Sequence, residues 1–221
     1  HEVEAAEQVE KPSVREILQI LWAALRSSPA LTMTIGGGVA FHFILGAATF
    51  EQLWLVEERG FGRTEIAELT GWIALAGGIL GNLFGGVGGD VFLRKTGMGR
   101  PMFLFWIMLI LTPLTIAYRF VDPGSFMFLL GIFLGYFQLG CFYGPTFSTV
   151  QELVPPQIRG TLVAFYILSL NLVGLGIGVT GAGYAIDWMA ESGVAEPYTV
   201  TLVVCSIVSA VEIPIVYICG R

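Results

Sequence analysis

The sequence is organised around residues 77–100, GGILGNLFGGVGGDVFLRKTGMGR. The first half of this stretch is apolar and repeats glycine at every fourth position, which places the glycines on one face of a helix. A lone aspartate, Asp90, and the densest basic cluster of the chain follow it. Charges directly after an apolar helix are typical of the point where the helix leaves a bilayer. The stretch therefore predicts a membrane helix that ends near Asp90.

The composition of the whole chain also indicates a membrane protein. Of the 221 residues, 55% are hydrophobic and only 13% are charged, which is too apolar for a water-soluble domain of this size. The net charge of −6 comes partly from an acidic leader, and no basic face predicts a nucleic-acid partner.

Enzyme signatures are missing from the sequence. It contains no nucleophile elbow, zinc-protease helix or Walker loop. A G-x-G-x-x-G pattern at residues 176–181 lies inside an apolar run with no strand before it, so it does not predict a nucleotide site. The three cysteines lie in apolar runs and indicate neither a disulfide nor a zinc framework. We expect no enzyme activity, no cofactor and no metal.

Residues 1–28 are expected to form a cytoplasmic acidic leader and an amphipathic linker helix. Ser13 and Glu16 have the spacing of a capping box, and apolar residues follow at helical spacing. This helix is too short and too charged to span a bilayer, so we expect it to lie along the membrane surface. A plain linker helix is the alternative.

Residues 29–221 are expected to form a six-helix transmembrane domain. Each helix needs about 20 apolar residues, and turns containing glycine or proline separate the candidate segments. The expected spans are about 30–55, 66–89, 101–118, 126–150, 161–186 and 198–219.

Basic residues predict the orientation of these spans. Of the 11 lysines and arginines, eight fall on the side of the two termini, and Arg59, Arg63 and Arg119 fall on the other. We therefore expect both termini to be cytoplasmic. The expected location is the inner membrane of a bacterium, with membrane lipids around an integral multi-pass protein.

Polar side chains inside the spans are candidates for function, because each is costly in hydrocarbon unless it faces a partner or a wet cavity. His42 can titrate near neutrality, which suits a proton-coupled carrier; a histidine hydrogen-bonded between helices is the alternative. Glu51 lies on the opposite side of a straight helix, so both residues line one cavity only if the helix breaks, for which Gly46 offers a place. Alternatively, Glu51 is hydrated at the outer mouth.

Gln138 is the candidate of the fourth span. Its neighbours Tyr136 and Tyr143 lie on a face that can bind the polar part of a ligand, although aromatic residues at this density can equally face lipid. Asn171 is a further cavity candidate, and it and Asn82 are expected to form hydrogen bonds between helices.

Glu212, next to Pro214 in the last span, has no partner that the sequence identifies. A carboxyl group at that depth must be protonated, paired or turned towards a gap left by the proline.

Glycines of the second span are expected to pack against another helix. Small residues let helix backbones approach closely, either as static packing or as a smooth face along which helices rock. The packing candidates are Gly77, Gly81, Gly85, Gly86 and Gly89.

Two turns on the expected cytoplasmic side carry the most specific motifs. Residues 86–90 read G-x-x-x-D and are followed by basic residues, and residues 152–159 begin with an acid and end with an arginine. In these motifs the chain resembles the major facilitator superfamily. The phrases GPTFSTVQELVPPQIRGTLVAF, at 144–165, and NLVGLGIGVTGAGYAID, at 171–187, are most similar to the second half of its Spinster-type members.

The resemblance implies an all-α membrane fold, the carboxy-terminal six-helix half of a secondary active transporter, preceded by a short amphipathic surface helix. Its partners would be the missing amino-terminal half, a lipid-like or amphiphilic small solute, and a proton. In the family's arrangement the first and fourth spans line the cavity, which favours His42, Glu51, Gln138 and Tyr143 over Glu212.

The charges at the two turns are interpreted as a cluster that stabilises one conformation and breaks in the other. Its members are Asp90, Arg94, Lys95, Glu152 and Arg159. Asp90 and Arg94 can meet as an i,i+4 pair if the helix continues. Charges that only set the topology are the alternative.

The sequence departs from the family at two places. Val91 stands where the family usually has a basic residue, and Val179-Thr180 stands where relatives often have proline. Two other functions stay open: a self-contained six-span homodimeric channel or carrier, and a membrane scaffold that transports nothing.

Overall fold

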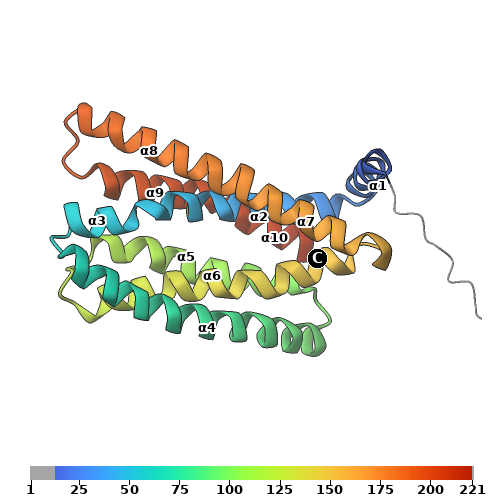
Figure 1. Ribbon diagram of the computed structural model, residues 1–221. Helices are drawn as coiled ribbons and strands as arrows, with labels where there is room; N and C mark the ends of the chain where they lie inside the picture. The colour runs from blue at the N-terminus through green and yellow to red at the C-terminus, as the bar shows by residue number, and fades with distance from the viewer. Residues whose placement is uncertain (1–12, 221) are drawn as a thin grey trace, which may run out of the picture.

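The computed structural model describes residues 13–220 of the chain, all but a few of them in helices (Figure 1). The acidic leader and Arg221 lie outside the described residues. The α-helices are α1 (Val14–Ser27), α2 (Pro29–Ala47), α3 (Glu51–Glu57), α4 (Arg63–Thr96), α5 (Arg100–Ala117), α6 (Phe126–Glu152), α7 (Arg159–Ser169), α8 (Gly176–Glu191), α9 (Pro197–Ser209) and α10 (Glu212–Gly220). Short 3₁₀ or π turns join several of them: η1 (Ala48–Phe50), η2 (Tyr118–Phe120), η3 (Pro156–Ile158) and η4 (Leu170–Leu175).

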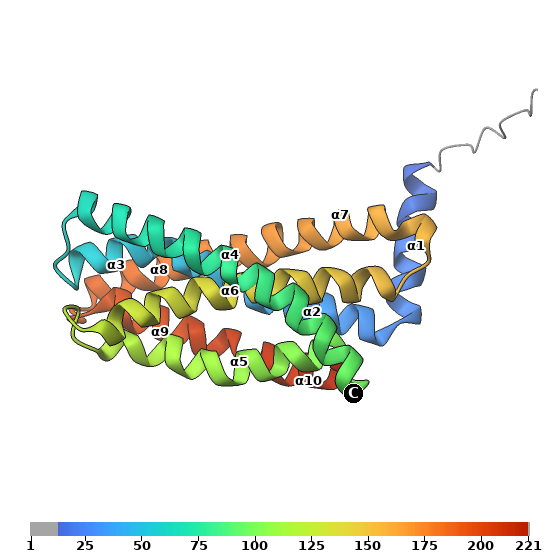
Figure 2. The same cartoon turned by 90° about the horizontal axis from the view of Figure 1, so that it is seen from below.

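Within the described residues, six helical segments are long and apolar enough to cross a membrane, which confirms the expected fold class. The segments are Pro29–Glu57, Arg63–Thr96, Arg100–Phe120, Phe126–Glu152, Pro156–Glu191 and Pro197–Gly220. They lie side by side in one bundle, with the turns at its two ends (Figures 1 and 2). Large apolar side chains on α4 and α8, such as Leu83, Ile177 and Trp188, are exposed on the outside of the bundle.

The second span differs from its expected bounds. The α4 helix does not end near Asp90 but continues to Thr96, and Gly97 closes it in the left-handed conformation that glycine adopts without strain. Asp90 therefore lies within the last turns of a helix and not in a loop.

The α1 helix begins as its capping box predicts. Ser13 Oγ accepts from the Glu16 backbone N–H at 3.3 Å, and Glu16 Oε2 accepts from the Ser13 N–H at 2.7 Å. The hydrogen bonds that the Ser13 backbone N–H and hydroxyl donate to Glu16 Oε2 lower the pKa of the Glu16 carboxyl group. The helix ends at Ser27 and runs across one end of the bundle (Figure 2).

The glycine face of α4 packs directly against the backbone of α6. A methyl group on Gly77 would lie 3.0 Å from the Phe133 carbonyl oxygen, and methyl groups on Gly81 and Gly85 would collide with the α6 backbone. A methyl group on Gly140, on the opposing helix, would lie 2.7 Å from the Gly78 carbonyl oxygen. The absence of side chains at these positions is therefore what permits the contact.

A second close contact joins α2 to η4 and α8. Methyl groups on Gly46 and Gly178 would each collide with the facing backbone, and one on Gly174 would lie 2.7 Å from His42 Cβ. The first span breaks directly after this contact, at η1, where Thr49 Oγ1 donates to the Gly46 carbonyl at 2.8 Å. The break near Gly46 that the sequence allowed is therefore present.

Candidate functional site: a polar pocket between α2, α5, α6 and α9

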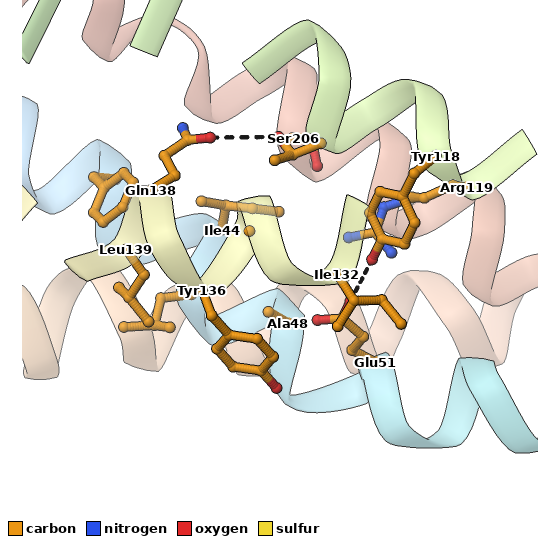
Figure 3. A pocket seen from close by; sticks show the side chains of 14 residues that line it. Ile44, Ala48, Glu51, Tyr118, Arg119, Ile132, Tyr136, Gln138, Leu139 and Ser206 are labelled. Carbon is orange, nitrogen blue, oxygen red and sulfur yellow. Dashed lines mark hydrogen bonds between the residues drawn. The ribbon is translucent and has the colours of Figure 1, made fainter. Parts of the chain in front are cut away.

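A pocket of about 120 Å³ opens between α2 and α3 on one side and α5, α6 and α9 on the other (Figure 3). Most of its wall is apolar, from residues such as Phe41, Ile44 and Leu139. The polar side chains that line it are Glu51, Thr115, Tyr118, Arg119, Tyr136, Gln138 and Ser206. Three of the expected cavity residues, Glu51, Tyr136 and Gln138, therefore share one pocket.

Glu51 is held at the pocket by Tyr118. Glu51 is the first residue of α3, directly after η1, and the Tyr118 hydroxyl of η2 donates to Glu51 Oε1 (Figure 3). The Tyr118 ring itself is buried against Trp54 and Phe128. Glu51 is thus a positioned hydrogen-bond acceptor in an apolar cluster.

Arg119 is the residue of this pocket that sequence reasoning missed. The sequence placed it among the outer charges that set the topology, but η2 extends the third span past it and its residue is only 5% exposed. Its guanidinium lies 5.0 Å from the ring centroid of Trp54 and 5.1 Å from that of Tyr118. Its Nε and Nη1 have no hydrogen-bond partner among the described residues, so a buried cation with free donors borders the pocket.

Gln138 is anchored to α5. Its Nε2 donates to Thr112 Oγ1 at 3.0 Å and contacts Met108 Sδ at 3.0 Å, while Thr115 Oγ1 lies 3.5 Å from its Oε1. Figure 3 shows the side chain turned across the top of the pocket. Its role as a polar wall residue depends on these contacts, which no local sequence pattern indicates.

His42 and Tyr143 pair with each other beside this pocket, and neither lines it. Tyr143 Oη lies 3.4 Å from His42 Nε2, and His42 Nδ1 lies 3.0 Å from the Gly38 carbonyl oxygen. Because a carbonyl only accepts, Nδ1 carries the hydrogen and Nε2 is left to accept from the tyrosine. The arrangement matches the interhelical histidine that the sequence left open as an alternative.

The two asparagines do not join helices. Asn171 is exposed on η4 and donates to Ile167, and Asn82 is exposed on α4 and donates to Gly78, so each bonds its own helix. Among the described residues neither has an interhelical hydrogen bond, and Asn171 lies outside the pocket. Their interhelical role was a wrong prediction, because the faces that carry them are not packed.

A shallower groove of about 500 Å³ lies between α3, α4 and α6. Tyr136 lines both the groove and the pocket, and Gln52 Nε2 donates across the groove to Thr70 Oγ1 at 2.6 Å. Tyr136 therefore separates two hollows on one side of the bundle.

The charge cluster at the other end is centred on Arg100, which the sequence analysis did not include. Arg100 Nε donates to Asp90 Oδ1 at 2.8 Å, and Arg100 Nη1 donates to Glu152 Oε1 at 2.5 Å. Arg94 donates only to the backbone carbonyl of Asp90, at 3.3 Å, so the expected Asp90–Arg94 ion pair is absent. The extended α4 helix carries Asp90 to the start of α5, where Arg100 is closer.

Lys95 and Arg159 take no part in that cluster. Neither forms an ion pair within the described part of the chain, and both side chains are exposed. Gly86 likewise differs from the other packing glycines, because a methyl group there would meet nothing within 4 Å.

The opposite end of the bundle carries a second polar network. Glu58 accepts from the backbone N–H groups of Tyr198 and Thr199 at 2.7 and 2.9 Å, and so caps the start of α9 from another span. Arg59 donates to Glu196 at 3.1 Å and to the Arg119 carbonyl at 3.1 Å. The hydrogen bond from Arg59 lowers the pKa of Glu196.

No group of three or more His, Cys, Asp or Glu side chains among residues 13–220 is arranged to hold a metal ion.

Comparisons with known proteins agree with this architecture. A sequence model of the Major Facilitator Superfamily matches residues 1–216. A search of curated proteins returned no match. Among solved structures, a bacterial homolog of the human lysosomal transporter Spinster, in an inward-facing and unoccupied conformation, matches with a TM-score of 0.80 at 16% identity.

That match covers 100% of this chain but 52% of the other chain, so this chain spans about half the length of the solved structure. At this identity the match describes the fold. The chain belongs to the Major Facilitator Superfamily, and its six spanning helices have the fold of one half of such a protein.

Proposed function

We propose that this chain is one half of a secondary active transporter for a lipid-like or amphiphilic small solute, coupled to protons. Family membership supports transport, and a second six-helix half would complete the protein. The proposed class of solute is supported by the pocket, in which a buried cation and a carboxylate lie at one end of an apolar wall.

The charges of the pocket favour a solute with a polar, zwitterionic end. Arg119 lines the pocket with a positive charge, which suits a carboxylate or phosphate group, and Glu51 offers acceptors that suit an ammonium group. Phe41, Ile44 and Leu139 supply the apolar surface for the remainder of the solute.

Two features support alternating access. The glycine contact between α4 and α6 brings two backbones together without interdigitating side chains, so a rocking motion meets little steric resistance. The cluster of Arg100, Asp90 and Glu152 joins the ends of α4, α5 and α6 by ion pairs, which would have to break if these ends separated.

Proton coupling is proposed on the basis of His42. This residue is buried where α2 meets α6. A proton on Nε2 would turn this nitrogen from an acceptor into a donor, so that Tyr143 could no longer donate its hydroxyl hydrogen to it. The hydrogen bond between the two helices would then have to reverse.

The experiment is uptake into proteoliposomes that contain this chain alone or together with a complementary six-helix half. The probe is a fluorescent zwitterionic single-chain amphiphile, compared with its anionic and cationic analogues. We expect uptake only with both halves and at least a tenfold loss in Arg119→Gln, because a charge-assisted hydrogen bond contributes about 1.5–3 kcal/mol. Arg15→Gln, an exposed arginine of α1, is the matched control and should change uptake less than twofold.

Each rival function has its own result in this assay. Full-rate uptake by the chain alone would favour the homodimeric channel or carrier, and no uptake under either condition would favour a scaffold. An uptake rate that is unchanged by an imposed pH gradient would contradict proton coupling but not transport.

A further inference from the structure

Glu212 is a buried acid that the proposed solute pocket does not use. It is the first residue of α10, directly after Ala210 and Val211 interrupt the sixth span, and is only 3% exposed. Its Oε1 has no hydrogen-bond partner among the described residues. Transporters commonly place ion sites where a membrane helix is interrupted, because backbone and side-chain polar groups are free there.

A small cavity of about 40 Å³ lies against Glu212. It has room for a water molecule. Phe41, Ile44, Thr115, Gln138 and Ser206 line both this cavity and the solute pocket, so the two hollows share one wall. One layer of side chains therefore separates the larger pocket from the cavity beside the carboxyl group.

The polar groups around the cavity accept hydrogen bonds and have few donors left. Ser206 and Ser209 donate to the backbone carbonyls of Leu202 and Ser206 at 2.7 and 3.0 Å. Thr115 donates to the Thr112 carbonyl at 3.0 Å, and both contacts of Gln138 Nε2 are made on α5. An ionised carboxylate needs donors, whereas a protonated carboxyl group donates its O–H to one of these acceptors.

No basic side chain of the described residues lines this cavity. The α2 helix presents Phe41 and Ile44, while α5, α6 and α9 present neutral hydroxyl and amide groups. The Tyr166 hydroxyl of α7 is buried and does not line this cavity. His42 and Arg119 have their contacts elsewhere, with Tyr143 and with Trp54. A negative charge on Glu212 would therefore stand uncompensated in this conformation.

We propose that Glu212 is a proton-binding site inside the membrane, occupied in this conformation and emptied when water enters from the solute pocket. On release the Glu212 O–H bond breaks, the proton goes to a water molecule of the cavity as hydronium, and the carboxylate stays behind. Uptake of a proton reverses the step. The role of this exchange in transport rests on the proposed function, whereas the proton binding itself does not.

Labelling with dicyclohexylcarbodiimide tests the site, because this apolar reagent modifies protonated carboxyl groups in apolar surroundings. The full protein in proteoliposomes is labelled over a range of pH, with and without sodium, and peptides are quantified by mass spectrometry. We expect labelling of Glu212 at neutral pH, its loss in Glu212→Gln, and at least a tenfold fall as the pH is raised. Labelling of Glu51 in the same sample shows that the reagent reaches the carboxyl groups of this part of the bundle.

Three results would overturn the proposal. An unlabelled Glu212 in a sample where Glu51 reacts would mean that it holds no accessible proton. Labelling that persists unchanged at alkaline pH would make Glu212 a static structural acid. Protection by sodium at constant pH would make the cavity a sodium site. The labelling does not depend on solute transport, so it tests proton binding even if the protein transports no solute. A failure of the proposed function can therefore be distinguished from a failure of this inference.

Discussion

The guanidinium of Arg100 lies 2.5 Å from the carboxylate of Glu152, although 52 positions separate the two residues. Arg100 is the first residue of α5 and Glu152 the last of α6, and Asp90 of α4 bonds the same guanidinium at 2.8 Å. One arginine therefore ties three membrane helices together at one end of the bundle. Its side chain is 15% exposed while both carboxylates are more than half exposed, so the arginine is the least exposed member of the cluster.

Replacing Arg100 tests whether this cluster holds a conformation. We expect Arg100→Gln to shift the balance between the two access states, measured by the accessibility of single cysteines from each side, because both ion pairs are lost. Exposed ion pairs contribute about 0–1 kcal/mol each, so a several-fold shift is the expected size. Arg94→Gln is the control, since Arg94 reaches only a backbone carbonyl. Equal effects of the two variants would mean that the charges of the cluster set the topology and do not stabilise one conformation.

Gly81→Ala is expected to destabilise the bundle. Its methyl group would collide with the Phe137 carbonyl and lie 3.1 Å from Gly140 Cα, and backbone atoms cannot move aside as a side chain can. Overpacking of this kind costs about 1–3 kcal/mol, which a lower thermal unfolding midpoint in detergent would report.

Gly86→Ala provides the matched control on the same helix. Its methyl group would point into open space, so the higher helix propensity of alanine should leave stability unchanged or raise it by up to about 1 kcal/mol. A neutral Gly81→Ala would mean that α4 and α6 do not pack as closely as described.

Glu58→Ala is expected to loosen the start of α9. The carboxylate accepts the first free N–H groups of that helix and the Thr199 hydroxyl at 2.6 Å, and loss of a helix cap costs about 0.5–2 kcal/mol. Hydrogen exchange at the Tyr198 and Thr199 amides should rise in this variant. Glu57→Ala, which removes an exposed carboxylate 3.8 Å from Arg63, should leave that exchange unchanged.

The Arg59–Glu196 pair predicts a dependence of stability on acid pH. Its hydrogen bond lowers the pKa of Glu196 in the folded protein below the usual 4.5, so the pair stabilises the fold above pH 4.5 and this contribution is lost as the pH falls through the lowered value. Glu196 is 48% exposed, so solvent screening keeps the effect below about 1 kcal/mol. Thermal midpoints of the native chain and of Glu196→Gln should converge below pH 4.5, and a gap that persists in acid would contradict the assignment.

Several elements were predictable because their causes are local. The cap of α1 needs only Ser13 and Glu16, three residues apart, and each span needs only a long apolar run. The spacing of Gly77, Gly81 and Gly85 likewise indicated a packing face, although not which helix would cover it. The all-helical fold followed from such patterns, whereas the family was indicated by a resemblance in the motifs at the two turns.

The partners of the charged residues were not predictable in the same way. Arg119 and Arg63 are both arginines near the ends of apolar runs, yet one is buried between aromatic rings and the side chain of the other is 79% exposed. Asp90 could reach Arg94 on its own helix, but the turn before α5 brought Arg100 closer. The burial and pairing of a side chain depend on which residues a distant segment places opposite it. The spacing of residues along one helix does not contain that information.

The sequence alone thus determined that the chain forms six apolar helices with a glycine face, preceded by a capped first helix, because hydrophobicity, capping and backbone clearance act over a few neighbouring residues. Only the tertiary structure decided that Glu51, Arg119 and Gln138 share a pocket, that Arg100 centres the charge cluster, and that Glu212 lacks a partner. The cost of a charge in a membrane is set by the groups that face it, and those groups come from other helices.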